Sequence, residues 1–320
     1  MKKQIIFYLL SLILVAGAEA QQLPFYTQYR SNLFILNPAV AGTKRTIDAR
    51  VGYRMQWVGY DGAPKTATVS VNSRFMKGKM GAGAYLVEDK IGPTKQTNLG
   101  VSYAYHIRFP DCELSAGVGG MFTKYSLVGG DIILHNTHDK AIDQNVTNST
   151  WTPDACAGIY LYNDRFHIGM GALHLMENRA TFYKHDSTHN GKVPYRAHLN
   201  FTVGYNFAQN PDYIWESTVL AEYVSGVPFM LDYTLRLHIQ QKMICGLSLR
   251  LHDAVALHLG AMFMDDFQVI YSYDFLISKL RPTNSGSHEL MLTYSFMNHK
   301  SKHRGHIDTQ FIKQKYGYMF

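Results

Sequence analysis

The sequence contains few cysteines and, after its first residues, no long apolar run. Its three cysteines are Cys112, Cys156 and Cys245, and an odd number without paired spacing does not form a disulfide framework. One bridge between two of them is the alternative, but we expect three free thiols that are buried or face lipid. Beyond residue 20, no stretch approaches the roughly 18 apolar residues of a membrane-spanning helix. The mature chain is therefore either an exported soluble protein or a membrane β-barrel.

Motifs of enzymes and of ligand sites are also missing. The chain contains no G-x-S-x-G, H-E-x-x-H or P-loop pattern, so we expect no catalytic residue and no cofactor. Histidine and aspartate gather in two predicted loops, but their spacing fits neither a helix nor a tight turn, and we expect solvated side chains rather than a metal site. These residues are His135, His138 and Asp139 in one loop and His185, Asp186 and His189 in the other.

The first twenty residues have the pattern of a secretory signal peptide. Lys2 and Lys3 form a charged start, an apolar stretch follows, and Ala18-Glu19-Ala20 resembles a cleavage site. A transmembrane helix is the alternative, but the apolar stretch is shorter than the roughly 20 residues that a spanning helix needs. We predict that residues 1–20 are removed on export. Export to the envelope also argues against a nucleic-acid partner, although the formal net charge is +7.

Apolar and polar residues alternate along most of the remaining chain. From Tyr195 to Phe207, every second residue is apolar or aromatic, and the residues between are polar or small. A strand directs successive side chains to opposite faces, so such a segment has one apolar and one polar face. We predict an all-β protein, a transmembrane antiparallel β-barrel of about 14 strands within residues 44–297. The predicted strands are 46–58, 65–75, 79–88, 96–109, 112–125, 152–163, 165–174, 195–208, 213–223, 229–239, 242–252, 255–264, 267–276 and 287–297.

The links between these strands alternate in length. They are short after even-numbered strands, and several are long after odd-numbered ones, notably 126–151, 175–194 and 277–286. Barrels of bacterial outer membranes have short periplasmic turns and longer outer loops. We therefore expect a protein of the cell outer membrane, in contact with outer-membrane lipids, whose N- and C-termini both lie in the periplasm.

Residues 21–43 precede the first predicted strand and are too apolar for a free tail. A short helix is expected from Ser31 to Leu36, ended by Asn37-Pro38. We expect this plug-like segment to pack at the periplasmic mouth of the barrel. Glycines also recur at every second position of several strands, where close packing inside a tilted barrel explains them. They are Gly81, Gly83, Gly117, Gly119, Gly120, Gly169 and Gly171.

The polar face of the predicted barrel carries many ionisable groups of both signs. In an open lumen they would tune ion selectivity, whereas in a filled lumen they would pair and hold internal segments. Because both signs are abundant and a wide barrel needs something inside, we favour the filled lumen. The groups are Asp48, Arg50, Arg54, Arg74, Arg196, His198, Glu216, Glu222, Asp232, Arg236, His238, Arg250, His258 and Asp274.

An ordered set of short motifs resembles a known family. The set begins with residues 22–29, followed by residues 36–42, which include Asn37, Pro38, Ala39 and Gly42. It ends with residues 288–296, which resemble the family's final strand. Between them lie Arg54, Gln56 and Trp57, then Gly62 and Pro64, then Gly92 and Pro93. Together they resemble the PorP/SprF family of type IX secretion system membrane proteins.

This resemblance implies an outer-membrane barrel of a secretion or gliding apparatus. Its implied partners are a periplasmic ring, made of a lipoprotein and a partner protein, or a large secreted adhesin. We therefore predict a non-enzymatic component that anchors or links such partners to the outer membrane. A passive porin-like channel or uptake pore is the alternative.

Residues 298–320 form a basic tail behind the last predicted strand, and we predict that it binds a periplasmic partner. The basic residues would attract an acidic surface and the aromatic ones would anchor the contact. A frayed terminus and a role of Phe320 in barrel insertion are the alternatives. The predicted partner-binding residues are Lys300, Lys302, Arg304, Lys313, Lys315, Tyr316, Tyr318 and Phe320.

Overall fold

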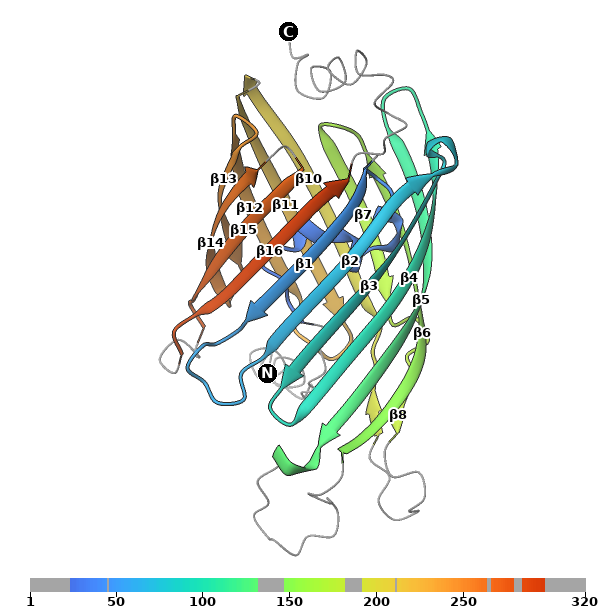
Figure 1. Ribbon diagram of the computed structural model, residues 1–320, viewed down its shortest axis with the longest axis vertical. Helices are drawn as coiled ribbons and strands as arrows, with labels where there is room; N and C mark the ends of the chain where they lie inside the picture. The colour runs from blue at the N-terminus through green and yellow to red at the C-terminus, as the bar shows by residue number, and fades with distance from the viewer. Residues whose placement is uncertain are drawn as a thin grey trace, which may run out of the picture.

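The structure is a computed structural model that describes residues 24–44, 46–131, 147–181, 192–210, 212–263, 266–278 and 284–296 (Figure 1). The predicted signal peptide, the basic tail and the two histidine-containing loop segments lie outside these residues. Among the described residues, no helix is long and apolar enough to cross a membrane.

Within the described residues, fourteen antiparallel strands close into a barrel (Figure 1). The closing pair is formed by β1 and β16, with Ile47 opposite Phe296 and Met55 opposite His288. This confirms the prediction of a closed antiparallel barrel of about 14 strands. The strands are β1 Ile47–Met55, β2 Lys65–Phe75, β3 Met80–Ile91, β4 Thr94–Arg108, β5 Glu113–Val128, β6 Thr147–Tyr162, β7 Phe166–Leu173, β10 His198–Asn210, β11 Tyr213–Val224, β12 Met230–Ile239, β13 Met243–Arg250, β14 Ala254–Phe263, β15 Phe267–Leu276 and β16 Ser287–Phe296.

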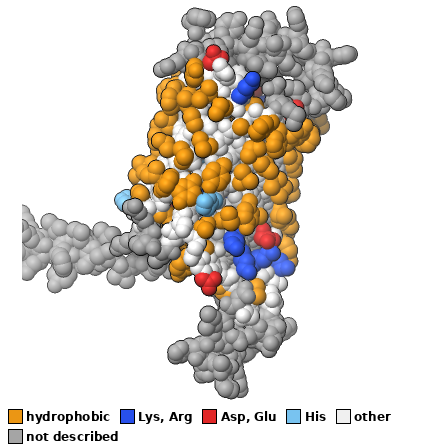
Figure 2. All heavy atoms as spheres, turned by 60° about the vertical axis from the view of Figure 1, so that its left-hand side comes forward, with side chains coloured by type: hydrophobic (Ala, Val, Ile, Leu, Met, Phe, Trp, Pro, Cys, Tyr) orange, Lys and Arg blue, Asp and Glu red, His pale blue; other side chains and the backbone are white. Residues whose placement is uncertain are grey.

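Alternation along the strands separates an apolar outer wall from a polar interior. On β1, Val51 and Tyr53 are about half exposed, at 49% and 45%, whereas Asp48 and Arg54 are buried at 1% and 2%. Hydrophobic side chains accordingly cover the middle of the face that Figure 2 shows. Water is excluded from the hydrocarbon layer, so the apolar face meets lipid and the polar face turns inward.

Three features differ from the sequence-based prediction. Strands β4, β5 and β6 are longer than predicted, so that the link between β5 and β6 is shorter than 126–151. A separate two-stranded sheet, β8 Arg179–Thr181 with β9 Lys192–Pro194, was not predicted. The alternating pattern also misplaced Tyr195. Because β10 begins at His198, Tyr195 is not on the lipid-facing side, but is 5% exposed and stacked on His174.

The two ends of the barrel differ in their links. We call one end the turn end, where β1 begins, β16 ends and the links 76–79, 109–112, 163–165 and 240–242 lie. The opposite, loop end carries 56–64, 129–146, 174–197 and 277–286 among its links. The links at the turn end are therefore all short and the long links lie at the loop end, as the sequence predicts. The 92–93 and 251–253 links at the loop end are short as well.

Residues 24–44, here called the inner segment, lie within the barrel (Figure 1). Two 3-10 helices form it, η1 Tyr29–Ile35 and η2 Pro38–Val40, and Asn37 caps the second by accepting a hydrogen bond from the backbone N–H of Ala39 at 2.9 Å. The expected helix over 31–36 is thus close to η1. Its apolar side chains form two clusters with residues of the wall, one around Tyr29, Leu33 and Leu36 and the other around Phe34 and Tyr85.

Candidate functional site in the barrel interior

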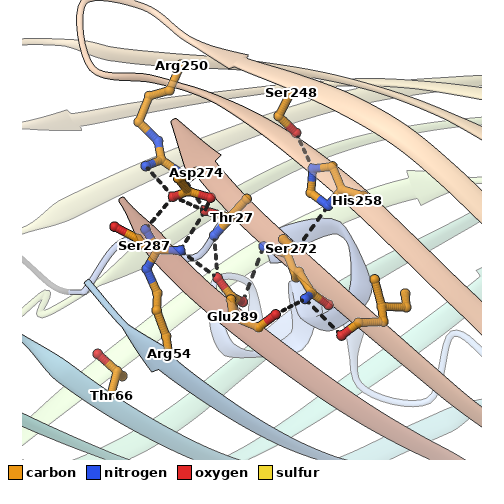
Figure 3. A network of polar contacts seen from close by, with 12 residues as sticks. Thr27, Arg54, Thr66, Ser248, Arg250, His258, Ser272, Asp274, Ser287 and Glu289 are labelled. Carbon is orange, nitrogen blue, oxygen red and sulfur yellow. Dashed lines mark hydrogen bonds and ion pairs between the residues drawn. The ribbon is translucent and has the colours of Figure 1, made fainter. Parts of the chain in front are cut away.

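Arg54 is the centre of a buried polar cluster near the loop end (Figure 3). Its guanidinium donates to Oδ2 of Asp274 at 2.7 Å, to Oε2 of Glu289 at 3.0 Å and to Oγ1 of Thr27 at 2.7 Å. Arg54, Asp274 and Glu289 project from β1, β15 and β16, whereas Thr27 belongs to the inner segment. A single planar side chain therefore joins three neighbouring strands to the inner segment.

The start of the inner segment also binds these acids directly. The backbone N–H of Thr27 donates to Glu289 Oε2 at 2.8 Å, and its hydroxyl donates to the Asp274 carboxylate at 2.7 Å. The side-chain amide of Gln28 donates to the carbonyl oxygens of Ile270 and Glu289 at 3.1 and 2.9 Å. Thr27 and Gln28 are both fully buried. These bonds satisfy polar groups that would otherwise be costly to bury.

A second arginine approaches the cluster from the opposite side. Arg250, on β13, lies 3.3 Å from Asp232, 3.2 Å from Asp253 and 3.9 Å from Asp274. Its guanidinium also lies over the ring of Phe25 in the inner segment, 5.7 Å from the ring centroid. Figure 3 shows Arg54 and Arg250 directed at Asp274 from two sides. Buried carboxylates are thus compensated by buried guanidinium groups, the condition under which such charges are stable.

The middle of the inner segment is tied to another part of the wall. Arg30 forms an ion pair with Glu216 of β11 at 2.5 Å, and Arg236 of β12 donates to the Ser31 hydroxyl at 3.0 Å. Burial opposes the charge of Arg30, but the Glu216 carboxylate raises the pKa of its guanidinium above the ordinary value. Burial also raises the pKa of the neighbouring Tyr29 hydroxyl, which keeps its proton and donates to the carbonyl of Thr218 at 3.3 Å.

Glycines of β3, β5, β6 and β7 form the surface on which Leu36 to Gly42 lie. A Cβ atom added to Gly117 would lie 2.4 Å from the backbone nitrogen of Ala39, and one added to Gly158 would lie 2.1 Å from Asn37 Oδ1. Any larger residue would therefore overlap with the inner segment. Gly81 and Gly171 make similarly close approaches. Close packing therefore explains most of the predicted strand glycines, and for Gly81, Gly83, Gly117 and Gly171 the partner is the inner segment. Gly119 and Gly169 pack against residues of the wall instead. The prediction is wrong for Gly120, where an added Cβ would meet nothing within 4 Å.

Asn37 fixes the position of this stretch. Its side-chain amide donates to the carbonyl oxygen of Ile159 at 3.0 Å, in addition to capping η2. Towards the turn end, the carbonyl oxygen of Ala41 accepts a hydrogen bond from the His106 ring at 3.0 Å, and the N–H of Gly42 donates to Asn72 at 3.1 Å. The contacts of the inner segment therefore extend from the turn end to the Arg54 cluster near the loop end.

The predicted family-motif residues fall into two groups. Asn37, Pro38, Ala39 and Gly42 lie in the inner segment and Arg54 in the cluster that binds its start, so the structure brings this group together in the interior. Gln56, Trp57, Gly62, Pro64, Gly92 and Pro93 lie in the links at the loop end.

These loop-end residues connect neighbouring links through the backbone. Gln56 donates to the Pro64 carbonyl at 3.0 Å, Gly92 to the Gly62 carbonyl at 2.9 Å and Val128 to the Pro93 carbonyl at 2.9 Å. The positive φ angles of Gly62 and Gly92, 70° and 52°, are conformations that glycine adopts readily. Within the part of the chain that the structure describes, these loop-end residues shape the rim of the barrel.

The remaining site predictions concern residues that the structure does not describe or does not assign to a site. The eight predicted partner-binding residues of the tail and the two histidine groups lie outside the described residues. Within the described residues, no group of three or more His, Cys, Asp or Glu side chains could hold a metal ion. The three cysteines are free, as predicted.

Thr27, Gln28 and Glu289 were not predicted from the sequence to be parts of the Arg54 cluster. They are separated from one another by as many as 262 positions, and a threonine or glutamine before the first strand carries no signal of burial. The useful signal was indirect. An apolar segment before β1, inward-facing charges of both signs and period-two glycines each require a partner in the interior.

Comparison with solved structures supports the barrel. The chain is similar to the toluene transporter TbuX of Ralstonia pickettii, with a TM-score of 0.52 and 11% identity over 82% of this chain and 93% of that one. It is also similar to the CymD monoaromatic hydrocarbon channel, with a TM-score of 0.50 and 13% identity over 88% and 95% of the two chains. At such identities the likeness shows a common fold alone.

Comparison of the sequence with protein families gives a more specific result. No curated protein matches the chain. A family model described as type IX secretion system membrane protein PorP/SprF matches residues 18–294, from the end of the predicted signal peptide to the last barrel strand. The chain therefore belongs to the PorP/SprF family of type IX secretion system membrane proteins.

Proposed function

We propose that this outer-membrane barrel is a closed, non-enzymatic anchor of the type IX secretion or gliding machinery. In this role it holds a periplasmic ring, made of a lipoprotein and its partner, or a large secreted adhesin, at the outer membrane. The observation that carries the proposal is the occupied interior. The inner segment follows the barrel from end to end and contacts residues on most sides of its wall.

The strength of these contacts favours a permanent occupant. Arg54 and Arg250 bind the start of the inner segment, and Glu216 and Arg236 bind its middle. The glycine surface is in such close contact with the segment that an added side chain would overlap with it. Buried, fully partnered ion pairs become costly when one partner is removed. Moving the segment out of the lumen would leave Glu216 without Arg30, and would remove the hydrogen bonds that Thr27 donates to Asp274 and Glu289. A closed barrel is consistent with anchoring and unsuited to conducting a substrate.

The proposed orientation places the turn end in the periplasm. Outer-membrane barrels have short periplasmic turns and longer extracellular loops, and the longest links here, 129–146 and 174–197, are both at the loop end. The chain enters β1 and leaves β16 at the turn end, where Ile47 pairs with Phe296. Residues 298–320 would then begin in the periplasm, on the side of a periplasmic ring.

A cysteine-labelling experiment tests this orientation. Cysteine is introduced at Asp61 in the loop-end link or at Lys242 in a turn-end link, in a chain whose three cysteines are replaced by serine. A membrane-impermeant maleimide applied to intact cells should label position 61 and not position 242. Labelling of position 242 alone would reverse the proposed orientation.

The tail is the proposed docking element for the periplasmic partner. It contains five basic residues against the single acid Asp308, and it closes with Tyr316, Tyr318, Met319 and Phe320. Basic side chains steer association with an acidic surface, and aromatic side chains contribute most of the anchoring free energy in many interfaces. A frayed terminus or a role in membrane insertion are the competing explanations.

Deletion of residues 298–320 separates these explanations. If the tail docks the partner, the truncated barrel still inserts and still shifts on a gel between unheated and boiled samples, but ring components no longer co-purify and secretion fails. Loss of insertion would instead assign the tail to assembly. An unchanged phenotype would refute docking through the tail.

A passive channel is the second candidate, because TbuX is a toluene transporter and CymD a monoaromatic hydrocarbon channel by their descriptions. The similarity to both is one of fold, and the position of the inner segment within the barrel argues against an open path for a substrate. Uptake of a small apolar molecule that is lost on deletion of the chain, with secretion intact, would favour the channel over the anchor.

A further inference from the structure

Three arginines in the turn-end half of the interior share two acids. Arg30 of the inner segment pairs with Glu216 of β11 at 2.5 Å, and Arg50 of β1 pairs with Asp48 at 2.9 Å. Arg236 of β12 is directly opposite Glu216 in the strand register, but its guanidinium binds a hydroxyl of the inner segment instead. Three buried or half-buried guanidinium groups are therefore matched by only two carboxylates.

The acids near these arginines have further partners. Lys44 lies 3.3 Å from Asp48, and the ring of His238 lies 3.3 Å from Glu216. The turn-end halves of β13 to β16 add no acid, because the described residues that they direct inward are uncharged. On the other side of the inner segment, Glu113 is bound by two arginines of its own. Positive charge is therefore in excess around the three arginines.

Several N–H groups in this part of the interior have no partner. Among the described residues, Nε of Arg30, Nε of Arg50, and Nε and Nη2 of Arg236 are buried without a hydrogen-bond acceptor. The side-chain amide nitrogen of Asn32 also lacks an acceptor, and Asn32 is only 4% exposed. Buried donors without a partner are costly and rare, and a bound ion is one way to satisfy them.

Arg30, Asn32 and Arg50 lie close together. Asn32 accepts a hydrogen bond from the Ser70 hydroxyl at 3.2 Å, and Ser70 is directly opposite Arg50 in the strand register. Arg30 and Asn32 are two positions apart in η1, and the charges of Arg30 and Arg50 are near enough to repel each other. Such repulsion is stronger inside a protein than in water, and an anion between the two groups would remove it.

Solvent reaches these residues from within the barrel. The side chain of Arg30 is 26% exposed and that of His238 is 30% exposed, although both belong to the interior. Arg50 and Glu216 are each the fourth residue of their strand, counted from the turn end. The Arg54 cluster lies further along β1 towards the loop end, so the shorter route to the arginines is from the turn end.

We propose that Arg30, Asn32 and Arg50 form a binding site for an oxyanion, a carboxylate or phosphate group that enters from the turn end. Guanidinium groups bind two oxygens of such a group through paired N–H donors, and the Asn32 amide supplies a neutral donor beside them. The bound anion offsets the excess charge and connects the inner segment to β1. With the orientation proposed above, the site is open to the periplasm.

Isothermal titration calorimetry on the purified full-length protein in detergent tests this site. The probes are inorganic phosphate, succinate and hexaglutamate, titrated at constant ionic strength in chloride buffer. We expect at least one probe to bind, and Arg50→Gln to bind it at least about tenfold more weakly. Arg108→Gln removes the same charge from an exposed residue near the turn end and should bind like the unchanged protein. If water alone satisfies the donors, no probe binds, and that result or equal binding by Arg50→Gln would overturn the proposal.

The three probes separate the sources of the anionic group. Phosphate as the tightest probe would support a site for free phosphate, whereas hexaglutamate bound more tightly than succinate would support carboxylates carried by a polypeptide. These measurements use purified protein and do not depend on membrane orientation. A reversed result in the cysteine-labelling experiment would change the compartment that supplies the anion and would leave the affinities intact.

Asn32→Asp tests the excess charge without a free ligand. The new carboxylate has nearly the shape of the amide and lies beside Arg30 and Arg50, so it should take the place of the anion. We expect this variant to bind the probes at least about tenfold more weakly, while its midpoint of urea unfolding stays the same or rises. Asn200→Asp is the control, since the Asn200 amide is buried and donates to the Leu36 carbonyl, and its midpoint should fall. An equal fall in both variants would contradict the site.

Discussion

Replacing Arg54 by alanine should cost this barrel more stability than any change at an exposed ion pair. Arg54 is 2% exposed and makes three contacts, to Asp274, Glu289 and Thr27, at 2.7–3.0 Å. Its removal leaves two buried carboxylates, and the nearest remaining cation to Asp274 is the guanidinium of Arg250 at 3.9 Å. Breaking a buried pair in this way costs about 3–5 kcal/mol. We expect a loss of that order in the free energy of unfolding.

Arg108 provides the matched control. It pairs with Glu113 at 3.1 Å, but its side chain is 53% exposed. Exposed pairs contribute about 0–1 kcal/mol, so Arg108→Ala should reduce stability by no more than this. A third variant, Arg54→Lys, keeps the charge but cannot bridge both carboxylates as a planar fork, and should fall between the two.

Urea unfolding of the barrels in detergent micelles, followed by tryptophan fluorescence, measures these differences. The unheated proteins should first be shown to run as folded barrels on a gel. If Arg54→Ala lost no more stability than Arg108→Ala, the Arg54 cluster would not hold the inner segment, and the account of a closed interior would lose its main support.

Two further changes examine the inner segment itself. Gly158→Val places side-chain atoms where Asn37 lies, only 2.1 Å from the position of an added Cβ, and should displace the segment so that protease cleaves between Leu33 and Val40. Gly120→Val, whose Cβ would meet nothing within 4 Å, should leave it protected, and equal protection in both variants would contradict the close packing. Asn37→Ala removes the cap of η2 and a hydrogen bond to the Ile159 carbonyl, and should lower the free energy of unfolding by about 1–2 kcal/mol. An unchanged free energy in urea unfolding would show that Asn37 does not fix the inner segment.

The barrel itself could be predicted from the sequence because its rule is local. A spanning strand alternates between lipid and lumen, and residues such as Val51 and Tyr53 against Arg50 and Arg54 reveal that alternation directly. The rule failed at Tyr195, where the alternating pattern continues beyond the strand. Alternation reports which residues could share a face and not where the hydrogen-bonded strand begins.

The interior site could be predicted only in part. The sequence indicated that charged groups such as Arg54 and Asp274 face inward and that something fills the lumen. It could not pair Arg54 with Thr27 and Glu289, because those contacts depend on strand order and on the path that the inner segment takes before η1.

Ionic conductance in planar lipid bilayers tests the closed interior most directly. The purified protein should insert without opening a steady pore, whereas a variant that lacks residues 21–43 but still migrates as a folded barrel should conduct. Stable currents through the unchanged protein, of the same size after the deletion, would show that the inner segment does not close the lumen and would contradict the account.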